Sequence, residues 1–298
     1  MTIDRPLRFA KGHGTENDFV LLPDPDGELA LDAELIRALC DRRAGVGGDG
    51  VLRVVRTAAA PEVAGADPAG TAAEWFMDYR NADGSIAEMC GNGVRVFARY
   101  LVHAGLAAPG TMPIATRAGV KTVTVPAEGD VVVDMGPPVF TGESVATFAG
   151  QPYAGVGVSM GNPHLVCATA TPVSELDLTA APDVDAAMFP DGVNVELVNA
   201  VPGAVPDGAD LHVRMRVHER GVGETRSCGT GASAAGAATL RAAGRARGAV
   251  IVDIPGGRVT VTVTADTSFL AGPAVVVAEG TLDPHWLAEA RRQVEVPA

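Results

Sequence analysis

The stretch that decides the fold is Met89-Cys90-Gly91-Asn92-Gly93-Val94-Arg95, because the chain contains it twice. The second copy is Ser227-Cys228-Gly229-Thr230-Gly231-Ala232-Ser233. Each copy puts one cysteine and two glycines ahead of an apolar segment of helical character, and a further glycine ends each segment. Both cysteines are therefore predicted at helix N-termini, where unpaired N–H groups and the helix dipole favour a thiolate.

The duplication extends well beyond the two cysteines. Asn81 precedes the first cysteine by nine residues (90 − 81), and Glu219 precedes the second by nine (228 − 219). A glycine follows each cysteine by 29 residues (119 − 90 and 257 − 228), and an alternating strand follows each glycine, at 120–125 and 258–263. We infer two homologous halves, each rich in strands and each presenting one cysteine at a helix start.

Composition and charge limit the classes of protein. The chain has 298 residues, of which 47% are hydrophobic, so two globular domains with cores of their own are expected. The formal net charge of −13 argues against nucleic acid and anionic membranes as partners. The N-terminus carries no apolar signal segment, and no apolar run approaches the ~20 residues that span a bilayer. We therefore expect a cytoplasmic protein without membrane contact.

Local patterns place the remaining elements. Strands are expected at 8–11, 19–22, 51–55, 75–80, 155–159 and 211–217, and helices at 32–42 and 283–293. The stretch 57–73, rich in Ala, Gly, Pro and Asp, is typical of a mobile surface loop. We predict a first domain of 1–134 with 279–298, whose last helix packs back on it, and a second domain of 135–278.

Two cysteines in equivalent places of two halves suit a two-base racemase or epimerase. One group removes the α-proton from one face of the substrate, and the other delivers a proton to the opposite face. The N–H groups that follow each cysteine can hold a carboxylate and stabilise developing charge. No cofactor is expected, because Lys11 and Lys121 are the only lysines, and neither a dinucleotide fingerprint nor a phosphate-binding loop is present.

Other readings of the cysteines stay open. Cys90 and Cys228 could form a structural disulfide, although a reducing cytosol argues against it. Cys40 and Cys167 lie in apolar contexts and are expected in the core. The four cysteines lack the pair spacing of a metal site, so no metal is expected.

Several further stretches also match a known family. They are Gly14 to Val20, Asn81 to Ser85, Met89 to Arg95, Gly161 to His164, Phe189 to Asn194, and Glu219 to Gly231. With these the chain resembles diaminopimelate epimerase over nearly its whole length, and most of all the actinobacterial branch. The resemblance implies a cofactor-independent isomerase that interconverts L,L- and meso-diaminopimelate for lysine and peptidoglycan precursor biosynthesis. It also implies a homodimer.

The resemblance implies roles residue by residue. Cys90 and Cys228 match the catalytic thiols. The residues that hold the carboxylate at the reacting centre match Gly91, Asn92, Gly229 and Thr230. The ligands of the amino and carboxylate groups match Asn17, Asn81, Asn162, Asn194, Glu219 and Arg220. His164 and Glu219 match residues that tune the thiols.

Each of these residues also has an ordinary structural reading. Asn17 and Asn162 are residue types that turns favour, and a histidine at a strand start, such as His164, is commonly structural. His13 and Asp49 are predicted to be structural. Gly50 stands where some family members carry a glutamine, so it receives no role.

The family implies an α/β (α+β) fold of two pseudo-symmetric domains. Each is a curled, mostly antiparallel sheet around a central helix, with the active site in the cleft between them. Two alternatives remain. A proline or hydroxyproline racemase would share the fold and the thiol pair, but typically carries His where Asn92 stands. A binding protein that lost its activity would retain ligand binding without exchange at the α-carbon.

Overall fold

The computed structural model describes residues 6–60 and 73–292. Most of the predicted surface loop at 57–73 therefore lies outside the described residues, and its described start forms a short 3-10 helix, η1 (Thr57–Ala59). The chain divides into two compact units. The first is Met1–Val131 together with Ala274–Ala298, and the second is Val132–Pro273.

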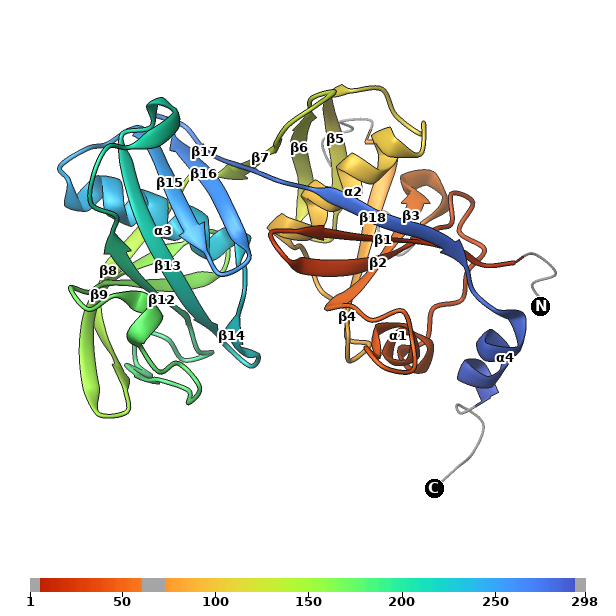
Figure 1. Ribbon diagram of the computed structural model, residues 1–298, viewed down its shortest axis with the longest axis horizontal. Coiled ribbons are helices and arrows are strands. Elements are labelled where there is room, and N and C mark those ends of the chain that lie inside the picture. The colour runs from red at the N-terminus through yellow and green to blue at the C-terminus, as the bar shows by residue number, and fades with distance from the viewer. Residues whose placement is uncertain (1–5, 61–72, 293–298) are drawn as a thin grey trace. The chain divides into compact units, whose positions relative to one another are not determined.

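The first unit is a curled sheet around one helix (Figure 1). Its elements are β1 (Arg8–Gly14), β2 (Asn17–Pro23), α1 (Ala33–Cys40), β3 (Gly50–Arg56), β4 (Trp75–Asn81), α2 (Gly91–His103), β5 (Gly110–Thr116), β6 (Gly119–Val125), β18 (Val275–Thr281) and α4 (Pro284–Arg292). The strands pair in the order β18–β1–β2–β3–β4–β5–β6, and α2 contacts most of them. Among these described pairs, β2–β3 and β4–β5 are parallel and the others are antiparallel.

The second unit repeats this order. Its elements are β7 (Val131–Gly136), β8 (Val139–Phe148), β9 (Gln151–Ser159), β10 (Pro163–Ala168), η3 (Val173–Glu175), β11 (Asp183–Val184), β12 (Asn194–Ala200), η4 (Pro206–Gly208), β13 (Leu211–Glu219), β14 (Gly223–Thr225), α3 (Gly229–Ala242), β15 (Gly248–Ile254), β16 (Gly257–Val263) and β17 (Ser268–Gly272). The strands pair as β8–β9–β10–β12–β13–β15–β16–β17–β7, with β10–β12 and β13–β15 parallel. The predicted fold class is therefore confirmed.

The parallel pair next to each helix start defines which residues of the two units correspond. In the first unit Phe19 on β2 pairs with Gly50 on β3. In the second unit His164 on β10 pairs with Asn194 on β12. The two registers make Phe19 the counterpart of His164. Two residues farther along the second strand of each pair, Leu52 becomes the counterpart of Glu196.

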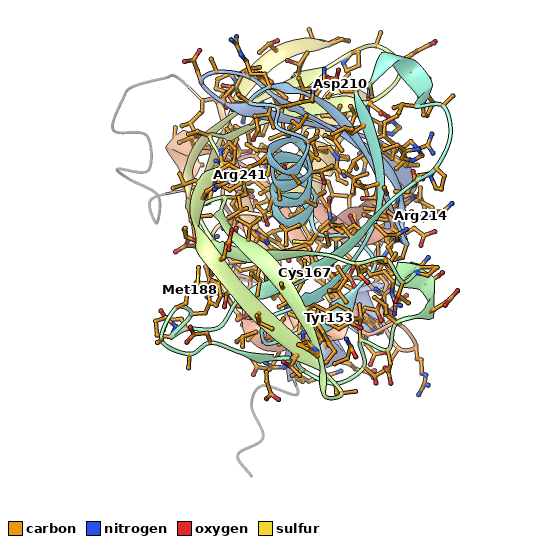
Figure 2. The ribbon with its side chains drawn as sticks, turned by 90° about the vertical axis from the view of Figure 1, so that its left-hand side faces the viewer. Tyr153, Cys167, Met188, Asp210, Arg214 and Arg241 are labelled. Carbon is orange, nitrogen blue, oxygen red and sulfur yellow. The ribbon has the colours of Figure 1, made fainter. Side chains whose placement is uncertain are left out.

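The central helices differ in how they fill their sheets. Helix α2 packs large side chains such as Phe97 and Leu101, which are fully buried. Helix α3 is built from Ala, Gly and Ser, and Figure 2 shows it nearly end-on with strands around it. At Gly236 an added Cβ would lie 2.7 Å from Val261 Cβ, so the strand touches the helix backbone. Small residues are thus required because α3 is surrounded closely.

The C-terminal helix belongs to the first unit. Trp286 and Leu287 of α4 pack on the core cluster that contains Leu35 and Leu39 of α1. The Trp286 indole Nε1–H also donates to the Ala44 carbonyl at 3.0 Å. None of the helices within the described ranges is long and apolar enough to cross a membrane.

Candidate functional site

Both predicted cysteines are helix N-caps, and they make the same contact. Cys90 precedes α2, and its sulfur accepts from the Gly93 N–H at 3.3 Å. Cys228 precedes α3, and its sulfur accepts from the Gly231 N–H at 3.4 Å. Gly91 and Gly229 are the first residues of the two helices, as predicted. Each sulfur therefore lies where the partial positive charge of a helix N-terminus is largest.

Two side-chain amides connect Cys90 to Arg95 through successive hydrogen bonds. Asn17 Oδ1 lies 3.6 Å from the Cys90 sulfur and accepts from Asn92 Nδ2 at 3.2 Å. Asn92 Oδ1 in turn accepts from Arg95 Nη2 at 3.0 Å. A guanidinium can only donate, so Arg95 determines which way the Asn92 amide is turned. That orientation then makes Asn17 Oδ1, an acceptor, face the thiol.

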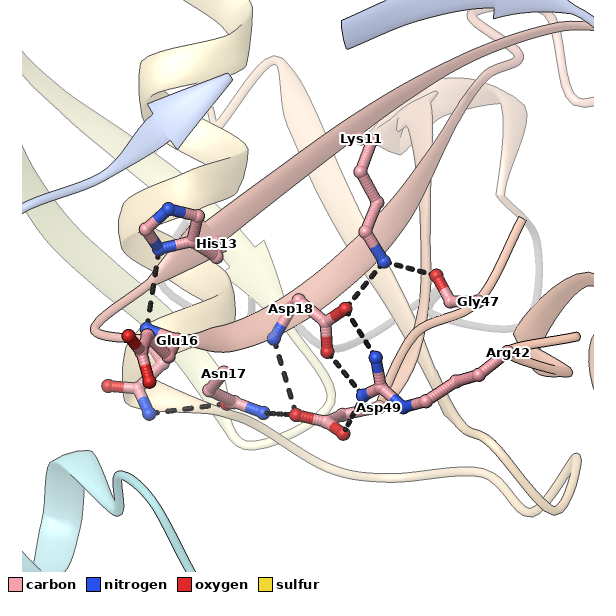
Figure 3. Close-up of polar contacts among 9 residues, drawn as sticks. Lys11, His13, Glu16, Asn17, Asp18, Arg42, Gly47 and Asp49 are labelled. Carbon is pink, nitrogen blue, oxygen red and sulfur yellow. Dashed lines mark hydrogen bonds and ion pairs between the residues drawn. The ribbon is translucent and has the colours of Figure 1, made fainter. Parts of the chain in front are cut away.

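This series of hydrogen bonds continues from Asn17 to a carboxylate. Asn17 Nδ2 donates to Asp49 Oδ2 at 2.7 Å, and Arg42 Nη2 donates to Asp49 Oδ1 at 2.7 Å (Figure 3). Arg42 also binds Asp18, whose second donor is Lys11. Although burial acts to raise the pKa of Asp18, these hydrogen bonds hold it below its ordinary value. Asp49, predicted to be only structural, therefore orients the amide beside Cys90.

Arg95, on α2, is a buried cation of the first unit. Its side chain is fully buried, and its Nη2 also donates to Thr15 Oγ1 at 3.3 Å. Nε and Nη1 have no hydrogen-bond partner within the described part of the chain. Burial lowers the pKa of Arg95 to about 10, while electrostatic interaction with Cys90 and Asp130 acts in the opposite direction. Cys90 thus faces a buried positive charge.

A hydroxyl and an amide accompany Cys228. Its sulfur lies 3.5 Å from Thr230 Oγ1. Thr230 Oγ1 accepts from Asn162 Nδ2 at 3.4 Å. Asn162 Oδ1 lies 3.1 Å from His164 Nε2, and His164 Nδ1 lies 2.7 Å from Glu196 Oε1. One series of hydrogen bonds therefore connects Cys228 to three predicted site residues, Thr230, Asn162 and His164.

The environment of Cys228 opposes ionisation. Burial is the main cause that raises its pKa well above the ordinary thiol value, and the charge of Glu219 adds to it. The hydrogen bonds from Thr230 and Gly231 act the other way. The expectation that a helix N-terminus makes the thiol easy to ionise is wrong for Cys228. Loss of hydration and the nearby carboxylate of Glu219 outweigh the helix dipole there.

The remaining predicted ligands have other hydrogen bonds in this structure. Asn81 Nδ2 donates to Ser85 Oγ at 3.0 Å, within its own turn. Asn194 Oδ1 accepts from the Arg220 backbone N–H at 3.0 Å, which ties the end of β13 to β12. Arg220 is exposed, and its Nη1 donates to the Asp191 carbonyl at 3.2 Å.

Glu219 forms a short hydrogen bond with the Thr225 hydroxyl. This bond joins the end of β13 to β14. The negative charge of Glu219 acts on Cys228, raising the pKa of that thiol.

Two charged residues were missed by sequence reasoning, Glu196 and Arg95. Glu196 lies between Val195 and Leu197 in a buried strand and shares a face with Asn194. A lone charge in such a run was the available signal. Arg95 stands five residues after its cysteine, where the second copy has Ser233. A difference between two otherwise matching copies was the signal there.

The other cysteines are ordinary core residues. Cys40 and Cys167 are buried, and burial raises the pKa of Cys40 to about 11 and that of Cys167 to about 12. This confirms their predicted place in the core. All four cysteines are free thiols, and the described residues contain no cluster of His, Cys, Asp and Glu suited to a metal ion.

Solved structures share the fold at low sequence identity. A hydroxyproline epimerase from Agrobacterium vitis superimposes with a TM-score of 0.62 at 15% identity, covering 96% of both chains. A phenazine biosynthesis protein of the PhzF family from Bacillus anthracis gives a TM-score of 0.64 at 18% identity, covering 93% of this chain and 99% of its own. At these identities the likeness is one of fold.

Sequence comparison is more specific. The family model for diaminopimelate epimerase matches residues 9–141 and 156–277. The diaminopimelate epimerase of Thermobifida fusca is 55% identical over 275 residues, which cover 92% of this chain and 97% of that protein. That of Rhodococcus jostii is 54% identical over 294 residues, covering 94% and 98%. The chain belongs to the diaminopimelate epimerase family.

Proposed function

We propose that this protein epimerises diaminopimelate with Cys90 and Cys228 as its two acid–base groups. Family membership supports the substrate and the reaction, which interconverts the L,L and meso forms in lysine and peptidoglycan precursor biosynthesis. The observation that carries the assignment of the thiols is their matching geometry. Each sulfur caps a helix and accepts from the N–H of the third residue after it.

The reaction needs only proton transfers. A thiolate takes the α-proton from one face of the substrate, and the bonding electrons remain on the α-carbon and its carboxylate. The second thiol then gives its proton to the opposite face and becomes the thiolate, so the centre is inverted and the charges are exchanged. The proposal requires the two sulfurs to reach opposite faces of one carbon, and no cofactor takes part.

The helix N-termini supply the stabilisation that an α-carbanion requires. The first backbone N–H groups of α2 and α3, at Gly91, Asn92, Gly229 and Thr230, point outward from the helix start, since the first turn of a helix directs its N–H groups away from the helix body. They suit the substrate carboxylate, on which negative charge builds up as the proton leaves. Asn17, Asn81, Asn162, Asn194 and Glu219 are proposed as the further ligands of the amino and carboxylate groups.

Arg220 is proposed to bind a carboxylate. Its guanidinium is exposed, and such a group can bind a carboxylate through two parallel hydrogen bonds. We expect Arg220→Ala to raise KM for diaminopimelate by roughly tenfold or more, since a hydrogen bond to a charged group contributes about 1.5–3 kcal/mol. Arg214→Ala, at an exposed position on β13, the strand that ends just before Arg220, is the control. An unchanged KM in Arg220→Ala would remove the assigned role.

The reaction is tested by solvent exchange. We expect incubation with L,L-diaminopimelate in D₂O, under reducing conditions and without added cofactor, to yield the meso form with deuterium at one α-carbon. Exchange into proline or hydroxyproline instead would identify a racemase of that kind. Binding of diaminopimelate without exchange, with both thiols shown to be reduced, would identify a protein that kept only the ligand site.

The thiols are tested by substitution. We expect Cys90→Ala and Cys228→Ala each to abolish epimerisation, because each removes one of the two acid–base groups. Cys40→Ala, in the core, should keep its turnover. Near-normal epimerisation by either of the first two variants would exclude the two-thiol mechanism. We also expect a homodimer in the cytoplasm, and light scattering coupled to size-exclusion chromatography would give the oligomeric state.

A further inference from the structure

The two thiols differ in the side chain that packs against the first turn of the helix that each one caps. Because the two units are duplicates, the residues at this position can be compared directly. Under Gly93 in the first unit lies Leu52, whose Cδ2 would be 3.4 Å from a Cβ added there. Under Gly231 in the second unit lies Glu196, whose Oε1 would be 2.5 Å from such a Cβ. An apolar residue in one copy is therefore replaced by a carboxyl group in the other, against the start of the helix that Cys228 caps.

Glu196 does not lie there alone. Its neighbour His164 occupies the position that Phe19 holds in the first unit. Both polar side chains are wholly buried, with a relative exposure of 0%, and they meet at 2.7 Å. The second unit thus carries a buried ionisable pair at the two positions where the first unit has Phe19 and Leu52. Such a pair is costly to bury, so a function beyond packing is expected of it.

The direction of the hydrogen bonds follows from Asn162. Its Nδ2 donates to Thr230 Oγ1, so its Oδ1 is an acceptor and requires a proton on His164 Nε2. The Thr230 oxygen accepts from Asn162, which leaves the Thr230 hydroxyl proton for the Cys228 sulfur at 3.5 Å. With Nε2 protonated, the remaining question is whether the proton between His164 Nδ1 and Glu196 lies on the nitrogen or on the oxygen.

The surroundings favour the oxygen. Glu196 Oε2 is buried without a hydrogen-bond partner in the described ranges, and an ionised carboxylate would leave a full negative charge unsolvated there. The ionisable groups that act on Glu196 are His164 and Glu219, and an ionised Glu219 repels a second anion. Burial raises the pKa of Glu196, in agreement with a neutral acid. A neutral acid also leaves the positive end of α3 to the Cys228 sulfur.

We infer that Glu196 is a positioning residue for Cys228, an inference that rests on the proposed role of that thiol. As a neutral acid Glu196 donates to His164 Nδ1 and keeps the imidazole in its Nε2–H form. His164 then orients Asn162, and Asn162 orients the Thr230 hydroxyl toward the sulfur. Cys228 therefore meets a hydroxyl donor that stabilises its thiolate, whereas Cys90 meets the acceptor oxygen of Asn17.

Two variants of Glu196 distinguish a positioning role from electrostatic repulsion between an ionised Glu196 and the Cys228 thiolate. Glu196→Gln keeps a donor for His164 Nδ1, and Glu196→Leu copies the residue of the first unit. The probe is iodoacetamide at pH 8.5, with each cysteine followed by peptide mass spectrometry. We expect alkylation of Cys228 to stay within twofold in Glu196→Gln and to slow at least fivefold in Glu196→Leu. Cys90 should change less than twofold in both variants and is the internal control.

Turnover should follow the same order. We expect kcat to stay within threefold in Glu196→Gln and to fall at least tenfold in Glu196→Leu. If Glu196 were an anion that repels the thiolate, both variants would alkylate faster at Cys228, and this result would overturn the inference. Alkylation reports on the sulfur itself, so it is readable even if Cys228→Ala were to keep its activity and the proposed mechanism failed.

A measurement on the unaltered protein does not depend on how the variants fold. Nitrogen-15 NMR of histidine-labelled protein, with His164 assigned by its loss in His164→Gln, reports the protonation of each ring nitrogen. At pH 8.5, the pH of the alkylation experiment, we expect a neutral ring protonated at Nε2. A ring protonated at both nitrogens, or at Nδ1 alone, would contradict the inferred state.

Discussion

At the scale of single residues, two equivalent thiols are given different chemistry by buried charges. Cys90 is half-buried and faces the cation of Arg95 through Asn92 and Asn17. Cys228 is buried, and Glu219 raises its pKa further. A two-base reaction needs one group as thiolate and the other as thiol at any moment. The residues around the caps, rather than the caps themselves, distinguish the two.

Arg95 allows a test at this scale. We expect Arg95→Met to lower kcat at least tenfold, because Asn92 loses the donor that fixes its amide. The free energy of unfolding should change by less than about 2 kcal/mol, since a buried guanidinium with two unpaired nitrogens contributes little net stability.

Denaturant unfolding and steady-state kinetics measure the two effects of Arg95→Met. Arg99→Met, on the same helix, is the control for kcat, because the side-chain hydrogen bonds of Arg99 among the described residues go to the carbonyls of Pro126 and Gly129. Equal kcat values for the two variants would contradict the role of Arg95.

At the scale of elements, the two central helices pack against their sheets with side chains of different size. Helix α2 fills its sheet with large side chains such as Phe97, and α3 approaches its strands so closely that only small residues fit. The close approach brings the first turn of α3 against β12, which carries Glu196. The small-residue composition of α3 is therefore connected to the chemistry at its N-terminus.

Overpacking at Gly236 tests this account of α3. We expect Gly236→Leu to lower the free energy of unfolding by about 1–3 kcal/mol or more, because its side chain would occupy the space of Val261. Ala242→Leu, at the exposed end of the same helix, should be nearly neutral. Thermal and denaturant unfolding measure both variants. The same stability for both would show that α3 is not tightly surrounded at Gly236.

At the scale of the whole molecule, an acidic chain keeps some carboxylates in the interior by pairing them with arginine. Asp78 is fully buried and accepts from Arg80 and Arg117, each at 2.7 Å. Burial acts to raise the pKa of Asp78, but the two arginines hold it below its ordinary value. A carboxyl group whose pKa is lower in the folded state adds stability above its unfolded pKa, and this stability is lost as the pH falls through the folded pKa.

We therefore expect the free energy of unfolding to fall on acidification below about pH 4, the ordinary range of an aspartate. Asp78→Asn should show a weaker dependence in this window, and at pH 7 it should be less stable by about 3–5 kcal/mol, because two arginines lose their partner. Asp266→Asn, at an exposed turn, is the control. Unfolding curves from pH 2 to 7 measure both. A dependence unchanged by Asp78→Asn would contradict the buried pair.

The sequence by itself determined the duplication, the helix caps and the fold class. Two copies of a short motif with matched offsets require two similar units, and a cysteine followed by glycines can begin a helix in any surroundings. Only the tertiary structure decided that Glu196 meets His164 and that Asp49 orients Asn17. These contacts join strands and loops far apart in the chain, so no local pattern contains them. The tertiary structure also decided the pKa of Cys228, because burial and neighbouring charge depend on what the whole unit packs around the sulfur.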